Sequence, residues 1–211
     1  MPFAEQRRRG PAGTIPLVAR PEPREARVTT IFLIGKLLSR HGEALCRIRN
    51  LSSGGLMAEV HVPLDEDDAV QVELKAGDRL SGRVRWTQEG RMGVAFDAQV
   101  EVAALLARAT ARTDEQKLAR APRFSADCAI ELGVDGRGRA GRLVNLSQGG
   151  ARLEADVVPE KGQLMTLAIP GLPERQGSVR WIGDGALGLA FAEPFAFDEL
   201  GVWLAERCGG A

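Results

Sequence analysis

Two short strings in this sequence place polar side chains and glycines at a spacing suited to binding a small ligand. The string Asn-Leu-Ser-X-Gly-Gly begins at Asn50 and recurs at Asn145, 95 residues later. Asn and Ser offer compact hydrogen-bonding groups and favour tight turns, whereas glycine permits φ > 0 or a close approach of the backbone to a ligand. A lone copy is most simply a β-turn. The candidate binding residues in the two strings are Asn50, Ser52, Gly55, Asn145, Ser147 and Gly150.

The residues around these strings also recur, which identifies a duplicated domain. GRVRWTQEGRMGVAF (82–96) matches GSVRWIGDGALGLAF (177–191) at the same offset of 95 residues. Upstream, REARV (24–28) matches RAPRF (120–124) at an offset of 96. Three blocks in the same order and with the same spacing indicate an internal repeat. The 211 residues therefore form two small domains, each large enough to bury a core.

The repeated unit has the pattern of β-structure followed by a helix. Apolar residues alternate with polar residues or glycine over 82–96 and 177–191, and the strings QEG and GDG indicate antiparallel hairpins with one buried face. This alternation predicts that Trp86 and Trp181 are buried in the core. Several short strands in each unit favour a small closed barrel. Helical spacing of apolar residues follows in the segments 100–111 and 197–208.

The domain organisation follows from these patterns. The first residues are rich in Arg, Pro, Gly and Ala without any period, which is typical of a flexible arm. The residues between the repeats favour helix by composition. We predict a flexible N-terminal arm over 1–22, a first domain over 23–111, a helical connector over 112–122, and a second domain over 120–211.

Composition narrows the classes of function. Lys+Arg and Asp+Glu are balanced at 28 each, so we expect no nucleic-acid binding, which needs an excess of basic residues. Three cysteines without a CxxC pair fit a reducing compartment, and no apolar leader or membrane span is evident, so we expect a cytoplasmic protein. The sequence contains no HExxH, P-loop or GxSxG motif, and the acidic run 65–68 resembles a solvated loop. We therefore expect no enzyme activity, no metal site and no cofactor.

The combination of motifs resembles the PilZ domain. An arginine motif, an [Asp/Asn]-X-Ser-X-X-Gly turn about twenty residues later, and the strings VRW and GVAF carry this resemblance in both repeats. It implies two tandem six-stranded antiparallel β-barrels, each followed by a C-terminal helix, that bind the bacterial second messenger cyclic di-GMP. The turn residues would hold one side of the ligand. Arginine suits its two phosphates and two purine faces, because it combines a charge, a bidentate fork and a stacking plane. The implied arginines are Arg24, Arg27, Arg120 and Arg123.

The arginine motif departs from the family pattern Arg-X-X-X-Arg. With Arg27 and Arg123 as the last arginine, Pro23 and Ala119 stand at the first position. Losing one charge-assisted phosphate contact costs about 1.5–3 kcal/mol, roughly 10- to 100-fold in affinity. Two functions therefore stay open. The chain is either a receptor whose domains reorient on binding cyclic di-GMP, or a PilZ-like scaffold that binds no nucleotide and acts through a protein partner.

Overall fold

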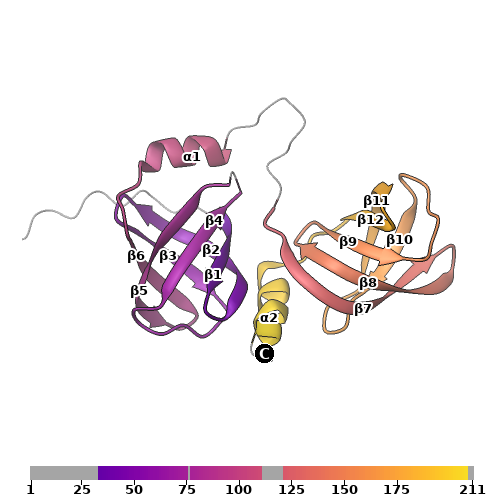
Figure 1. Cartoon of the computed structure of the whole chain (residues 1–211), viewed down its shortest axis with the longest axis horizontal. Helices are drawn as coiled ribbons and strands as arrows, with labels where there is room; N and C mark the ends of the chain where they lie inside the picture. The colour runs from indigo at the N-terminus through magenta and orange to yellow at the C-terminus, as the bar shows by residue number, and fades with distance from the viewer. Residues whose placement is uncertain (1–32, 76, 111–120, 209–211) are drawn as a thin grey trace, which may run out of the picture.

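The computed structural model describes residues 33–75, 77–110 and 121–208, which form two closed six-stranded antiparallel β-barrels, each followed by a helix (Figure 1). This confirms the predicted fold class. The first barrel consists of β1 (Leu33–Ser39), β2 (Gly42–Ser52), β3 (Gly55–Val60), β4 (Ala69–Leu74), β5 (Arg79–Gln88) and β6 (Arg91–Phe96), followed by α1 (Val102–Thr110). The second consists of β7 (Phe124–Val134), β8 (Arg137–Ser147), β9 (Gly150–Ala155), β10 (Leu164–Ala168), β11 (Arg175–Gly183) and β12 (Ala186–Phe191), followed by α2 (Phe197–Cys208).

Both barrels have the same strand order, β1-β2-β3-β6-β5-β4 in the first and β7-β8-β9-β12-β11-β10 in the second. The predicted arm over 1–22 lies outside the described residues. So does the predicted helical connector, apart from Ala121 and Pro122, which have no regular secondary structure. Within the described residues, no helix is long and apolar enough to cross a membrane.

Alternating side chains fill the interior of each barrel. Along β4, Val70, Val72 and Leu74 are buried and the residues between them are not, as expected for a strand with one face toward the core. The predicted hairpin turns form where QEG and GDG occur. Glu89–Gly90 and Asp184–Gly185 both have positive φ, which is the geometry of a tight two-residue hairpin turn.

Four β-bulges interrupt this alternation at equivalent places in the two barrels. In the first, Arg49 is an extra residue between Ile48 and Asn50 on β2, and Arg85 is an extra residue on β5. In the second, Val144 and Arg180 take these places. One extra residue turns every following side chain to the opposite face of the sheet. Each bulge therefore places the residue that directly follows it on the outside of the barrel.

The bulges overturn one prediction from the sequence. Trp86 and Trp181 are not buried core residues: each follows a bulge on the outer surface and is 38% exposed. Each indole instead covers a glycine of the neighbouring strand. A Cβ on Gly93 would lie 2.1 Å from Nε1 of Trp86, and one on Gly188 would lie 2.0 Å from Nε1 of Trp181.

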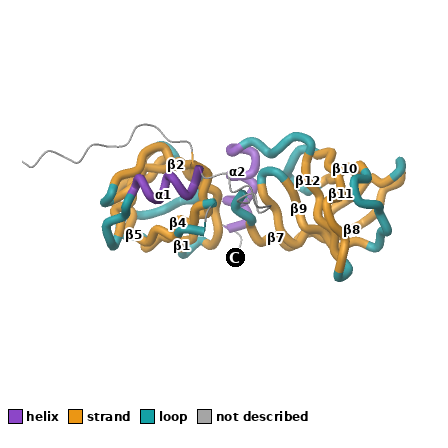
Figure 2. Tube along the Cα trace, turned by 90° about the horizontal axis from the view of Figure 1, so that it is seen from above, coloured by secondary structure: helices purple, strands orange, loops and turns teal. Residues whose placement is uncertain are grey.

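Helix α2 lies between the two barrels (Figures 1 and 2). One of its faces belongs to the second domain, because Leu200, Trp203 and Leu204 are buried in that core and Nε1 of Trp203 donates to the carbonyl oxygen of Pro170 at 2.8 Å. The opposite face contacts the first domain. There Gly201 packs against His61 so closely that a Cβ would lie 2.3 Å from its Cδ2 atom.

Further contacts join the domains beside this helix. Nε2 of His61 lies 3.1 Å from Oδ1 of Asp198, and the guanidinium of Arg47 lies 4.3 Å from the ring centroid of Phe197. The start of β7 also meets the first barrel directly, because the backbone N–H of Ser125 donates to Oε2 of Glu43 at 3.0 Å. By contrast, α1 packs on its own barrel, where it buries Leu105.

Candidate functional site

The two Asn-Leu-Ser-X-Gly-Gly strings form identical tight connections, from β2 to β3 and from β8 to β9. In the second barrel, the hydroxyl of Ser147 donates to the carbonyl oxygen of Gly150 at 3.0 Å. In the first, Ser52 donates to Gly55 at 3.1 Å. Because a hydroxyl has one proton, each serine is left with only acceptor capacity for a ligand. The serines therefore stabilise the turn. In a ligand complex, each hydroxyl oxygen could only accept a hydrogen bond from the ligand.

Gly55 and Gly150 are explained by strand packing. Neither has a positive φ, which excludes the first of the two roles that the sequence suggested for them. A Cβ on Gly55 would lie 2.3 Å from the carbonyl oxygen of Val94, and one on Gly150 would lie 2.5 Å from that of Leu189. Only glycine lets the strand that follows each turn approach its neighbour this closely. Ligand contacts by these glycines stay a prediction.

The arginine motif and the turn motif meet in the second domain. Nη1 of Arg123, which directly precedes β7, donates to Oδ1 of Asn145 at 2.9 Å. Two motifs that are 22 residues apart in the sequence thus form one polar cluster. Asn145 faces outward here because the bulge at Val144 turns it away from the core.

The first domain has the same asparagine without the same bond. Oδ1 of Asn50 is buried and has no hydrogen-bond partner among the described residues. Its counterpart of Arg123 is Arg27, which lies outside the described residues, as do Arg24 and Arg120. A buried acceptor without a partner costs about 1–3 kcal/mol, so a donor is needed at this position.

A cavity of about 260 Å³ lies over the turn of the first domain. The turn residues line one side, and side chains of β3, β5 and β6 line the rest. The sequence interpretation missed Trp86 and Met57 as parts of this surface, since alternation alone assigned the tryptophan to the core. The lining residues include Asn50, Ser52, Gly55, Met57, Arg85 and Trp86.

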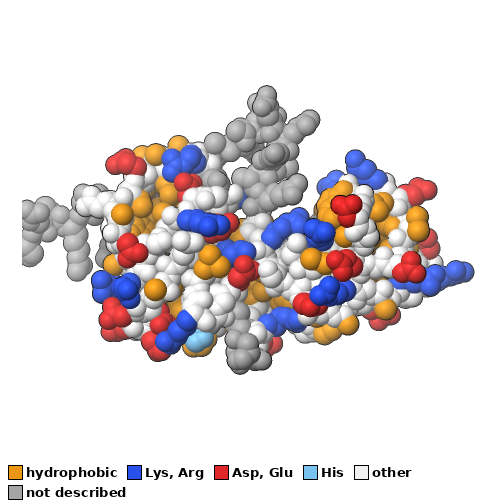
Figure 3. Space-filling view, viewed as in Figure 1, with side chains coloured by type: hydrophobic (Ala, Val, Ile, Leu, Met, Phe, Trp, Pro, Cys, Tyr) orange, Lys and Arg blue, Asp and Glu red, His pale blue; other side chains and the backbone are white. Residues whose placement is uncertain are grey.

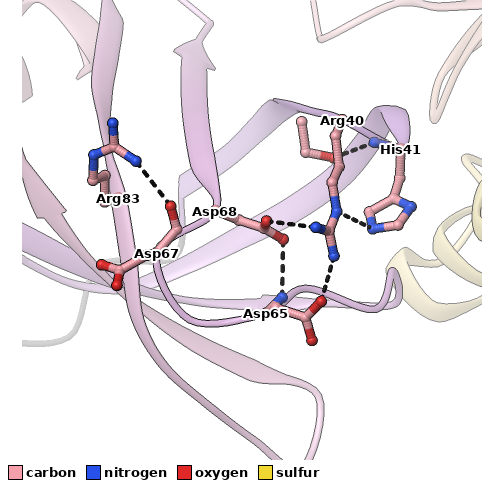
Figure 4. Close-up of polar contacts among 7 residues, drawn as sticks. Arg40, His41, Asp65, Asp67, Asp68 and Arg83 are labelled. Atoms are coloured by element: carbon pink, nitrogen blue, oxygen red, sulfur yellow. Dashed lines mark hydrogen bonds and ion pairs between the residues drawn. The ribbon is translucent and has the colours of Figure 1, made fainter.

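The acidic run 65–68 forms the connection between β3 and β4, in which the carboxylates of Asp65 and Asp68 meet at Arg40 and that of Asp67 points away from it (Figure 4). Arg40 pairs with both Asp65 and Asp68, and the latter also accepts from the backbone N–H of Asp65 at 2.9 Å. Arg83 donates to the carbonyl oxygen of Asp67 at 3.0 Å. In the described part of the chain, no group of His, Cys, Asp and Glu side chains is arranged to hold a metal ion.

Charged side chains of both signs are interspersed over the face in Figure 3, which carries no continuous basic stripe. This distribution matches the balanced composition of 28 basic and 28 acidic residues.

The chain is similar to three solved structures in particular. The first is PlzA of Borreliella burgdorferi in complex with c-di-GMP, at 12% identity over 85% of this chain and 93% of that one, with a TM-score of 0.35. The second is the inhibitor of motility MotI/DgrA of Bacillus subtilis, at 14% identity over 85% of this chain and 97% of that one, with a TM-score of 0.33. The third is YcgR of Escherichia coli in complex with c-di-GMP, at 12% identity over 83% of this chain and 81% of that one, with a TM-score of 0.29. No curated protein matches the chain. The model of the PilZ domain family matches residues 20–112 and 117–199, one match for each barrel. The chain therefore belongs to the PilZ domain family and contains two copies of the domain.

Proposed function

We propose that this protein is a receptor for cyclic di-GMP, with a ligand site at the turn motif of each barrel. The observation that carries the proposal is the hydrogen bond from Arg123 to Asn145, which unites the two ligand-binding motifs of the PilZ family. The solved complexes of PlzA and YcgR contain the same ligand. The proposed binding residues are Arg24, Arg27, Asn50, Ser52, Gly55, Arg120, Arg123, Asn145, Ser147 and Gly150.

The chemistry of the site suits a cyclic dinucleotide. A guanidinium held beside the turn brings permanent charge and a flat face, which match a phosphate and a purine. In the first domain, the buried Oδ1 of Asn50 needs a donor, which Arg27 or a base N–H of the ligand would provide. The exposed indole of Trp86 in the same cavity adds an aromatic surface for stacking.

We further propose that ligand binding changes the arrangement of the domains. Arg123 is followed directly by Phe124 and Ser125, which contact Lys36 and Glu43 of the first barrel. A ligand that engages Arg123 therefore acts next to the contact between the barrels. The ligand shifts the arrangement only as far as it binds one arrangement more tightly than the other. Superimposable X-ray scattering profiles with and without saturating ligand would exclude this part of the proposal.

A cytoplasmic, non-catalytic role completes the proposal. Cys46 and Cys128 are free, and burial raises the pKa of the Cys46 thiol to about 12, which makes it unreactive. Unpaired cysteines are typical of a reducing compartment. The output would pass to a downstream protein partner that recognises the ligand-dependent arrangement.

Calorimetric titration with cyclic di-GMP tests the receptor proposal. We expect micromolar or tighter binding by the unaltered protein. Arg123→Ala should weaken the second site by about 10- to 100-fold, because it removes a charge-assisted contact. Arg27→Ala should do the same at the first site. Arg139→Ala is the matched control, since this exposed arginine of β8 lies away from the turn motif.

The spacing of the arginines favours a second candidate function. Pro23 and Ala119 occupy positions where the family pattern has arginine, so both repeats lack one phosphate contact. A PilZ scaffold that binds no nucleotide and acts through protein contacts would tolerate this loss. Absence of heat with cyclic di-GMP, and with other guanine nucleotides, would overturn the receptor and leave the scaffold, whose protein partner would then be sought.

A further inference from the structure

We propose that Arg152 is a ligand-binding residue that makes the second site the tighter of the two. This inference rests on the proposed receptor function. Arg152 on β9 lies directly opposite Asn145 of β8. Residues opposite each other in an antiparallel pair share one face of the sheet, so the arginine lies on the same outer surface as the motif asparagine.

The equivalent residue of the first domain is Met57, which lies opposite Asn50. Both pairs directly follow a bulge, so the two positions are matched in register as well as in sequence. Met57 lines the cavity over the first turn together with Trp86. The repeats therefore share the scaffold of the site, and at this position a neutral methionine of the first stands where the second has a charged arginine.

Arg152 is held against the aromatic surface of the second site. Its guanidinium carbon lies 5.8 Å from the ring centroid of Trp181, within the range of a cation–π contact. The indole of Trp181 lies over Gly188 of β12. Gly188 is also the residue that pairs with Arg152 between β12 and β9. Such support orients a guanidinium before a ligand arrives, which reduces the ordering cost of binding.

The hydrogen-bonding state of Arg152 points to an anionic ligand. Its Nε atom is buried and has no partner among the described residues. No ion pair joins Arg152 to a carboxylate within this part of the chain. The nearest acid along the same strand, Glu154, pairs instead with Arg142. A phosphate oxygen is the acceptor that a cyclic dinucleotide supplies, and arginine binds it through its planar fork.

This residue compensates for the shortened arginine motif in one repeat only. Ala119 and Pro23 leave both repeats without one arginine, but the second domain regains a guanidinium at Arg152. The first domain, with methionine there, does not. We therefore expect the second site to bind cyclic di-GMP about 10- to 100-fold more tightly than the first.

A reciprocal exchange between the repeats tests the proposal. Arg152→Met places the residue of the first site in the second, and Met57→Arg does the opposite. By calorimetry, R152M should weaken the tighter binding event by about 10- to 100-fold, and M57R should tighten the weaker event. Arg139→Met is the control for loss of a positive charge and should leave both events unchanged. Thermal unfolding reports whether each variant remains folded.

Each outcome decides the proposal. Unchanged affinity in R152M, with binding by the unaltered protein, overturns this inference and leaves the receptor function standing. Tighter binding by R152M also overturns it, since Arg152 would then obstruct Trp181. Absence of binding by the unaltered protein overturns both. If R152M does not fold, Arg152→Lys serves instead. Lysine keeps the charge without the fork, so equal affinity in that variant also overturns the proposal.

Discussion

Replacing Gly201 by alanine should separate the two domains while leaving each one folded. Gly201 lies in the middle of α2, where its missing side chain lets the helix approach His61. A Cβ there would lie 2.3 Å from Cδ2 and 3.0 Å from Nε2 of that imidazole, so the helix must retreat by roughly 1 Å to restore ordinary contact. A shift of the ring would instead disturb its two contacts, because its centroid lies 5.3 Å from that of Phe197 and its Nε2 contacts Asp198.

The magnitude follows from two opposing effects. Overpacking a close contact costs about 1–3 kcal/mol, which lowers the docking equilibrium constant by roughly 5- to 150-fold. Alanine also favours helix over glycine by about 1 kcal/mol, and this gain stabilises the second domain whether or not it is docked. We therefore expect docking to weaken while the thermal stability of the second domain stays equal or rises.

Small-angle X-ray scattering of the full chain measures docking, and thermal unfolding measures stability. G201A should show a larger radius of gyration than the unaltered protein. His61→Ala provides the matched test, because removing the ring opens space for the new methyl group. In that background, G201A should no longer affect the scattering profile. Identical profiles for G201A and the unaltered protein would refute the close contact as the determinant of docking.

Two further substitutions test the packing around the candidate sites and the interface. Gly93→Ala should displace the indole of Trp86, since a Cβ would lie 2.1 Å from Nε1, lowering the free energy of unfolding by about 1–3 kcal/mol and shifting tryptophan fluorescence to longer wavelength. Gly54→Ala, with no atom within 4 Å, is the control, and an unchanged spectrum in G93A would contradict the assignment. Glu59→Gln tests acid stability. Burial acts against the shift, but hydrogen bonds and charge from Arg49 and Arg47 hold the pKa of Glu59 below its ordinary value of 4.5. That stabilisation is present above this value and lost as pH falls through the lowered pKa. Urea unfolding should therefore show a smaller loss of stability on acidification in E59Q; an equal loss in both proteins would exclude Glu59 as its source.

The barrels and the turns could be predicted because local rules determine them. Alternation in strands such as β4 requires only that one face meets the core. The hairpin turns at Glu89–Gly90 and Asp184–Gly185 need only residues that tolerate positive φ. Because the sequence is duplicated, each prediction for the first barrel also holds for the second, 95 residues later. The pairing of Arg123 with Asn145 agrees with the family resemblance, whereas the role of the site residues in binding stays a prediction.

The outer surface of the site could not be predicted because it depends on bulges. Val84 and Trp86 have the spacing of two residues on one face, and only the extra residue Arg85 places them on opposite faces. A bulge is a property of two paired strands, so one strand's sequence does not reveal it. The glycines opposite the tryptophans were the sequence feature that could have indicated the outward position of the indoles. Gly93 and Gly188 leave room for an indole on the outer surface, where any side chain would exclude it.

The two repeats differ at the position that allows α2 to lie between the barrels. The offset of 95 residues also relates the two helices: Leu105 of α1 and Leu200 of α2 are both buried against their own barrels. One residue further on, α1 has Leu106, which packs on its own barrel, and α2 has Gly201. A leucine at that position of α2 would hold the helix away from His61, so docking requires the glycine that α2 has there. The same logic applies to Met57 and Arg152 in the candidate sites. Duplication preserved the barrel and its turn. Gly201 in α2 and Arg152 in the second site are two of the positions at which the copies diverge, and each gives its domain a property that the other domain lacks.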